Sequence, residues 1–291
     1  MRAQTGVLPL RYISEAQLGL SHARNRGAAA ASGDLVVFLD DDALPDPGWV
    51  AALQAGAARY PEAGIFGGPI RLLLEAAPPP WFPAEVMPFV HWLGHHDFGA
   101  EDRPLVSEGN RYCGPGGGNL ALRRGLLEAV GPFAVALGRR GESLISGEEV
   151  LLVERARKLG HQVWYLAGAG VQHLVPAARL DRAWFVRRSF SEGRSQARIM
   201  ESLSDVVAER ASLIQQLTDR ARAVSDLSDR LARTGLCFGQ LSFKAQIDFA
   251  MVLGLVVELA AVLGQSRAEL KLPGQLPDDP ALPDEWRRFC S

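Results

Sequence analysis

The stretch Leu35-Val36-Val37-Phe38-Leu39-Asp40-Asp41-Asp42 decides the fold of this chain. Its first five residues are all apolar, and a continuous apolar run of this length predicts a strand that is buried on both faces. Three aspartates follow the run directly. Open α/β sheets bind their ligands outside the carboxyl ends of their strands. The stretch therefore predicts a buried strand that ends at a candidate binding site.

The acidic run also suggests what binds there. Clustered carboxylates repel one another, so they are best tolerated where a hard divalent cation offsets their charge. A cation held by Asp40 and Asp42 could bind a diphosphate and stabilise the charge that develops as that group leaves. The alternative is a solvated acidic turn, in which Asp46 only caps the next helix.

Segments on both sides of this run predict alternating strands and helices. The predicted strands are residues 8–14, 35–39, 63–68 and 162–166, and the predicted helices run from Ser21 to Gly33, from Pro47 behind the cap Asp46, from Asn119 to about Gly131, and over 147–159. Such alternation is typical of an α/β fold with a mostly parallel sheet. We expect this body to occupy residues 1–200.

Residues 69–112 interrupt the alternation. They are rich in proline and aromatic residues and show little periodicity, which predicts an irregular excursion of the kind that carries specificity elements. His91, His95 and His96 lie within it without a carboxylate at regular spacing. We interpret these three as surface or acceptor-loop residues.

The C-terminal third differs in character. Residues 201–234 have apolar positions near heptad spacing and predict a long amphipathic helix, either packed on the body or pairing with a second copy as a homodimer. Residues 235–271 predict an apolar helix. Its core, Phe249 to Leu263, is short for a bilayer span, so peripheral membrane contact through 245–264 and packing on the body both fit. Residues 272–291 indicate a loosely ordered tail.

Composition excludes several classes of protein. The formal net charge is -2 and no basic cluster is interleaved with aromatic residues, so we expect no nucleic-acid partner. Three widely separated cysteines lack the spacing of a zinc site and suggest a reducing compartment. The N-terminal residues lack the apolar stretch of a signal peptide. A cytoplasmic protein, with association at the inner face of the membrane as an option, is the resulting prediction.

Several motifs together carry a family resemblance. They are residues 19–27, 36–42, 45–49, 116–124 and 147–149. In their order and spacing over residues 8–195, the chain resembles family 2 glycosyltransferases of the GT-A fold. The resemblance implies a three-layer α/β/α fold with C-terminal helices added. It also implies transfer of a sugar, with inversion, from a nucleotide-sugar donor to a glycan or lipid-linked acceptor, assisted by Mn²⁺ or Mg²⁺.

The resemblance also assigns roles to residues. The implied donor-binding residues are Arg24, Asn25, Asp40, Asp41, Asp42, Gly117, Gly118 and Asn119, and the implied metal ligands are Asp42, Asp40 and His173. A carboxylate must remove the proton of the acceptor hydroxyl. Glu149 is the implied general base, with Glu148 as its reserve.

Each assignment has a simpler alternative. Ser146 and Glu149 have the spacing of a capping box, in which the glutamate only closes a helix end. The glycine run 114–118 could be a turn before a helix, and His173 a buried structural histidine.

One part of the family pattern is not present. Family members usually begin with a strand and a turn that cradles the nucleotide, and this chain starts at what should be the third strand. We therefore expect an N-terminally incomplete GT-A-like fold with an unpaired sheet edge. A non-catalytic module that serves as an assembly partner in glycan synthesis is the alternative function.

Overall fold

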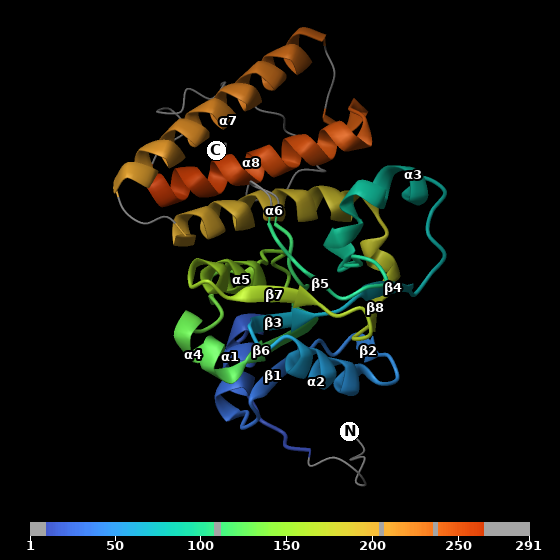
Figure 1. The fold of residues 1–291 in the computed structure, drawn as a ribbon. Helices are drawn as coiled ribbons and strands as arrows, with labels where there is room; N and C mark the ends of the chain where they lie inside the picture. The colour runs from blue at the N-terminus through green and yellow to red at the C-terminus, as the bar shows by residue number, and fades with distance from the viewer. Residues whose placement is uncertain (1–9, 108–111, 204–206, 235–237, 265–291) are drawn as a thin grey trace.

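The structure, a computed structural model, describes residues 10–264 except 108–111, 204–206 and 235–237 (Figure 1). The strands are β1 (Leu35–Leu39), β2 (Ala43–Pro45), β3 (Ala63–Gly67), β4 (Ile70–Leu74), β5 (Arg103–Pro104), β6 (Asn119–Arg123), β7 (Gln162–Tyr165) and β8 (Val171–Val175). The α-helices are α1 (Leu20–Ala30), α2 (Trp49–Arg59), α3 (Phe82–Val86), α4 (Arg124–Val130), α5 (Glu148–Lys158), α6 (Arg182–Leu203), α7 (Val207–Thr234) and α8 (Phe243–Leu263). The short 3-10 helices are η1 (Met87–Leu93), η2 (Ala177–Arg179) and η3 (Phe238–Gln240).

The main sheet has the strand order β1-β6-β3-β7-β5, and a smaller sheet has the order β2-β8-β4. Strand β6 pairs antiparallel with both β1 and β3, whereas β3 pairs parallel with β7. Strands β1, β3 and β7 therefore share one direction. The predicted α/β fold is confirmed. The sheet is less uniformly parallel than the sequence indicates, because β6 lies between β1 and β3 and runs antiparallel to both.

Helices cover both faces of the main sheet. On one face, Leu53 of α2 packs against Phe66 and Ala121. On the other face, α4 and α5 contribute Leu126 and Leu152 to the core that contains the inward side chains of β1 and β6. This is the predicted three-layer arrangement, in which the site-bearing ends of β1 and β6 are held rigidly from both sides.

Strand β1 has its predicted bounds but not its predicted burial. Val36 and Phe38 are buried, whereas Val37 and Leu39 are each 37% exposed. The reason is that β1 lies at the edge of the sheet and turns one face toward a cavity. The strand predicted at residues 8–14 is wrong for residues 10–14, which form no strand and leave the side chains of Leu10 and Tyr12 in solvent.

The sequence predicts Ser21 and Asp46 as the N-terminal caps of two helices, and both predictions are wrong. Glycines with positive φ precede α1 and α2, namely Gly19 at 141° and Gly48 at 84°. The Ser21 hydroxyl instead donates to the carbonyl of Ala134, and the Asp46 carboxylate pairs with Arg71. These polar side chains hold distant segments together rather than ending a helix.

Five strands were not predicted, namely β2, β4, β5, β6 and β8, and two of them show why. Residues 70–74, the start of the expected irregular excursion, form β4 alongside β8. Residues 119–123, expected as the start of a helix, form the central strand β6, and the helix begins only at Arg124. In both cases pairing with distant strands overrides a weak local pattern.

The C-terminal helices form a layer on the far side of α5 (Figure 1). Helix α6 runs past the expected end of the body at residue 200, and α7 and α8 pack with it in one apolar core. The apolar face of α7, with Leu217, Ala221 and Val224, is buried within this chain. Residues 272–291 lie outside the described residues.

Helix α8 lies within the predicted range of 235–271 and begins before the predicted apolar core, which starts at Phe249. By length and composition alone it is the one helix within the described residues that could cross a membrane, and half of its apolar window is buried inside the protein. It also carries Glu258, which is 8% exposed and accepts hydrogen bonds from Nε of Arg194 and of Arg198, each at 2.7 Å. Burial opposes ionisation of this carboxyl, but the two hydrogen bonds prevail and lower its pKa.

Helices α6 and α8 approach each other closely through glycine. A Cβ added at Gly254 would collide with the backbone carbonyl of Phe190, and one added at Gly193 would collide with the carbonyl of Met251. Only glycine allows the two backbones to meet at this crossing.

The Gly254→Ala variant tests this crossing. Because backbone cannot yield as a side chain can, we expect its free energy of unfolding to fall by roughly 1–3 kcal/mol. Gly125→Ala is the matched control, since nothing lies within 4 Å of its added Cβ in α4, and alanine should raise stability there by up to about 1 kcal/mol. Urea denaturation measures both variants, and equal stabilities would contradict the described packing.

Candidate functional site

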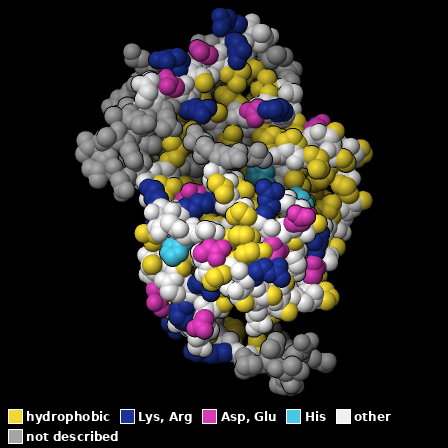
Figure 2. Space-filling view, in the orientation of Figure 1, with side chains coloured by type: hydrophobic (Ala, Val, Ile, Leu, Met, Phe, Trp, Pro, Cys, Tyr) yellow, Lys and Arg dark blue, Asp and Glu magenta, His cyan; other side chains and the backbone are white. Residues whose placement is uncertain are grey.

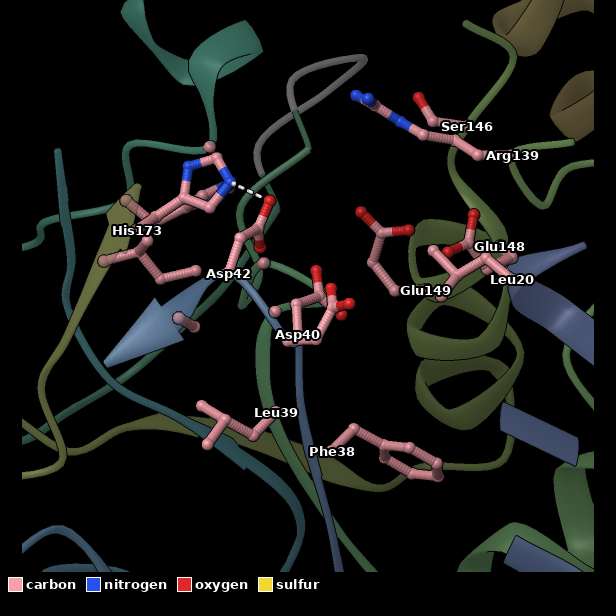
Figure 3. Close-up of a pocket in the computed structure, with 18 of the residues that line it drawn as sticks. Leu20, Phe38, Leu39, Asp40, Asp42, Arg139, Ser146, Glu148, Glu149 and His173 are labelled. Atoms are coloured by element: carbon pink, nitrogen blue, oxygen red, sulfur yellow. Dashed lines mark ion pairs between the residues drawn. The ribbon is translucent and has the colours of Figure 1, made fainter. Parts of the chain in front are cut away.

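A cavity of about 700 Å³ opens at the carboxyl end of β1 (Figure 3). Its walls come from α1, the end of β1, the glycine run before β6, the start of α5, and β8. The 3-10 helix η1 and helix α6 close the other side. The cavity therefore gathers segments from most of the α/β body.

Strand register places the acidic run. Leu39 pairs with Asn119, so the next residue, Asp40, lies beside Gly118. Ala43 pairs with His173 in the smaller sheet, which brings Asp42 against that histidine. The distance between His173 Nε2 and Asp42 Oδ2 is 3.3 Å, and Figure 3 draws this pair.

Arg24 is the central cation of the cavity. It is 6% exposed, lies 2.9 Å from Asp40 Oδ1 through Nη2, and pairs with Glu148 through Nη1. Burial alone would lower the pKa of Arg24, but attraction from Glu148, Asp40 and Glu149 raises it. The guanidinium therefore stays charged and joins the end of β1 to the start of α5.

The glycines of residues 114–118 are needed because there is no room for side chains, and not because the backbone conformation requires glycine. None of residues 114–118 has positive φ. A Cβ at Gly117 would lie 2.9 Å from two Arg24 nitrogens, and one at Gly118 would lie 2.9 Å from Asp40 Oδ2. The contact of Gly117 and Gly118 with a donor stays a prediction, and the groups that this backbone approaches in the structure are the side chains of Arg24 and Asp40.

The two glutamates occupy different environments. Glu148 is 2% exposed, and its Oε2 has no hydrogen-bond partner. Burial raises the pKa of Glu148 to about 7, with repulsion from Glu149 adding to the shift and Arg24 opposing it. Glu149 is half-buried, and its carboxylate points into the cavity (Figure 3).

The capping-box alternative for Glu149 is not what the structure contains. Gly147, with φ 104°, caps α5, and no side chain makes a cap hydrogen bond there. The Ser146 hydroxyl instead accepts from Arg188. Glu149 is thus left free of a helix-ending role.

Two predicted donor-binding residues face away from the cavity. The Asn25 amide exchanges hydrogen bonds with the backbone of Phe133 at 2.9 and 2.8 Å. Asn119 is fully buried, accepts from the Trp49 indole at 3.0 Å, and donates to Ala169 at 2.8 Å. Both amides hold the walls together, and neither residue lines the cavity, so their contact with a donor stays a prediction.

Some cavity residues were not predicted as site residues. Arg139, Arg179 and Arg188 line it, as do His91 and His96. Burial lowers the pKa of His96 to about 4, with repulsion from His91 and His95 adding to the shift, so His96 is neutral at neutral pH. Arg188 follows Trp184-Phe185 in a segment that resembles the family region closing over the site, where contact with a diphosphate and a solvated helix face are both open. No motif marks Arg139 or Arg179, and His96 is the second residue of the pair His95-His96.

The metal prediction can be compared with the donor atoms present. Across the described residues, no three or more histidine, cysteine or carboxylate side chains are grouped to hold a metal ion. Asp42 and His173 supply two adjacent ligands, and Asp40 is held by Arg24. Two protein ligands suit a cation such as Mg²⁺ that keeps waters and completes its shell with substrate phosphates.

This chain is similar to one protein family and to several known proteins. Residues 3–129 match the family described as Glycosyl transferase family 2. The glucosyl-dolichyl phosphate glucuronosyltransferase of Haloferax volcanii is 27% identical over 253 residues, which cover 84% of this chain and 77% of that protein. The succinoglycan biosynthesis protein ExoM of Rhizobium meliloti is 25% identical over 259 residues, covering 89% and 75%. A crystal structure of S. aureus TarS 1-349 aligns with 86% of this chain and 72% of its own at 15% identity and a TM-score of 0.34.

The Glu148→Gln variant tests the electrostatics of the buried glutamate. The pKa of Glu148 rises from 4.5 to about 7 on folding, so folding favours its protonated form. That stabilisation is fully present below about pH 4.5 and is lost as the pH rises through about 7. Between about pH 5 and pH 8, wild type should lose on the order of 1–3 kcal/mol more stability than the variant. Urea denaturation at both pH values measures this, and identical losses would contradict the assignment.

Proposed function

We propose that this chain, of which residues 3–129 match glycosyl transferase family 2, transfers a sugar from a nucleotide-sugar donor to a hydroxyl group of a glycan or lipid-linked acceptor. The observation that carries the proposal is the cavity that joins Asp40, Asp42 and Glu149. The relative from Haloferax volcanii is named for a dolichyl phosphate-linked acceptor, which supports acceptors of that kind for this chain.

The donor diphosphate lies at the acidic end of the cavity. Asp42 and His173 would hold Mn²⁺ or Mg²⁺, which neutralises charge on the diphosphate when bound. Asp40, fixed in orientation by Arg24, faces the ribose or diphosphate from the end of β1. The backbone of Gly117 and Gly118 borders the sugar, because the absent side chains keep that wall thin.

Glu149 is the general base. The acceptor oxygen attacks the anomeric carbon as the bond to the nucleoside diphosphate breaks, and Glu149 takes the hydroxyl proton. One displacement of this kind inverts the anomeric centre. Glu149 suits the role because its carboxylate faces the cavity from the first turn of α5, where the helix dipole favours an anion.

Glu148 has a positioning role rather than the reserve role predicted from the sequence. Its carboxylate pairs with Arg24, which in turn holds Asp40. The buried pair thereby sets the distance between the donor side and the base. Because Glu148 is 2% exposed and paired with Arg24, whereas Glu149 is only half-buried, an acceptor proton reaches Glu149 first.

The protein works in the cytoplasm, at the inner face of the membrane. Hydrophobic side chains gather on the surface around α3, whereas charges of both signs are spread over the sheet body (Figure 2). Met87, next to α3, is 63% exposed. An exposed apolar surface next to the cavity supports access to a lipid-linked acceptor.

The Glu149→Gln variant tests the base. We expect its transfer rate to fall about 100- to 10,000-fold, because the amide cannot accept the proton. Binding of the nucleoside diphosphate should be retained. Glu128→Gln, on the exposed face of α4, is the control and should keep full activity. Radiolabelled transfer from a panel of nucleotide sugars measures the rate, and a fully active Glu149→Gln would exclude the assigned base.

The Asp42→Asn variant tests the metal. Calorimetry with a nucleoside diphosphate in the presence and absence of Mn²⁺ should show binding that depends on the metal in wild type and is lost in the variant. Asp34→Asn, an exposed aspartate just before β1, should bind as wild type does. If folded wild type binds no nucleoside diphosphate at all, the non-catalytic assembly role replaces the enzymatic one.

A further inference from the structure

The cavity has a second charged region that the proposed chemistry does not use. Arg139, Arg179 and Arg188 line the cavity together with the residues named above. They come from the loop before α5, from η2 and from α6, so the fold rather than one helix face assembles them. We call them the arginine cluster.

Arg188 is a buried cation with unused donors. It is 6% exposed; its Nη2 donates to Ser146 Oγ at 3.0 Å and lies 2.9 Å from Glu192 Oε2. Its Nε and Nη1 are buried and have no hydrogen-bond partner. Leaving such donors unsatisfied is costly in the interior, so they indicate a group that binds there.

Arg139 and Arg179 add to the positive charge around Arg188. No carboxylate in the described part of the chain lies within ion-pair distance of Arg139 or Arg179, whereas Arg188 has only Glu192. Burial, followed by repulsion from Arg188 and Arg179, lowers the pKa of Arg139 to about 10. Three cations thus repel one another in a confined space, which an anion would relieve.

We propose that the arginine cluster binds a phosphate group carried by the acceptor, separate from the donor diphosphate. Arginine suits this ligand because its planar N–H groups match phosphate oxygens. The donor diphosphate belongs to the acidic end, where a cation offsets its charge. This inference rests on the proposed function and adds the chemical class of the acceptor, a phosphate ester.

The geometry fits a single acceptor that spans both sites. The Glu149 carboxylate points into the space between Asp40 and Arg139 (Figure 3), and its charge acts on both Arg24 and Arg139. A phosphate held by the cluster would place the attached sugar near Glu149. Trp92, buried with its ring 5.9 Å from the Arg188 guanidinium, adds an apolar wall beside the phosphate.

Binding measurements with small probes test the proposal. Calorimetry on the full chain would use glucose 1-phosphate, geranyl phosphate, and geraniol as the uncharged counterpart. Wild type should bind at least one of the two phosphates and bind geraniol at least tenfold more weakly. Binding of geranyl phosphate alone indicates a lipid phosphate as the source, and equal binding of both indicates the phosphate itself.

Matched variants locate the site. Arg188→Gln should weaken phosphate binding about 10- to 100-fold, as expected when charge-assisted hydrogen bonds are lost. Arg187→Gln is the control, because Arg187 is the exposed neighbour on the same helix and should bind as wild type does. Arg139→Gln, at a less buried position, provides a second variant if Arg188→Gln fails to fold.

A second measurement separates this inference from the proposed function. Metal-dependent binding of a nucleoside diphosphate should stay within about twofold of wild type in the Arg188 and Arg139 variants. An equal loss for nucleoside diphosphate and phosphate probe would assign the cluster to the donor and overturn the proposal. Intact donor binding with no phosphate binding in wild type would overturn it too, while leaving sugar transfer itself in place.

Discussion

The ion pairs of Arg24 are the interaction on which the rest of the site depends. A guanidinium that is 6% exposed would be strongly destabilising without partners, and its partners are Asp40 at the end of β1 and Glu148 at the start of α5. Asp40, Arg24 and Glu148 form a row in which each charged side chain is neutralised by its neighbour. The row therefore fixes α1, β1 and α5 relative to one another at the carboxyl end of β1, where the cavity opens.

Close packing around this row explains the glycines. Side chains at positions 117 and 118 would press on Arg24 and on Asp40, so the wall of the cavity at this point has to be bare backbone. Strand β6 follows immediately and is locked between β1 and β3. The same segment thus gives the cavity its thin wall and the sheet its central strand, and for that reason a local pattern describes it poorly.

Strong local signals made part of the fold predictable. The apolar run of β1, the acidic start of α5 and the short strand β7 lie within a residue of their predicted ends. The sequence predicts a helix from Asn119 because leucine, alanine and arginine are good helix formers. Residues 119–123 form a strand only because they pair with β1 and β3. Gly19 and Gly48 precede α1 and α2 with positive φ and make no side-chain cap. The sequence instead favours Ser21 and Asp46, because their polar side chains are typical of caps.

The candidate site was most predictable where charge and motif coincide. Asp40, Asp42, Arg24 and Glu149 all line the cavity, as their sequence context indicated. Asn119 stands in an equally good motif, yet every polar atom of its side chain is used by the walls. In a sequence, a residue that holds the wall and one that faces the ligand look alike. What separates them is whether donors remain unused after folding, and by that criterion Arg188 has more capacity to bind a ligand than Asn119.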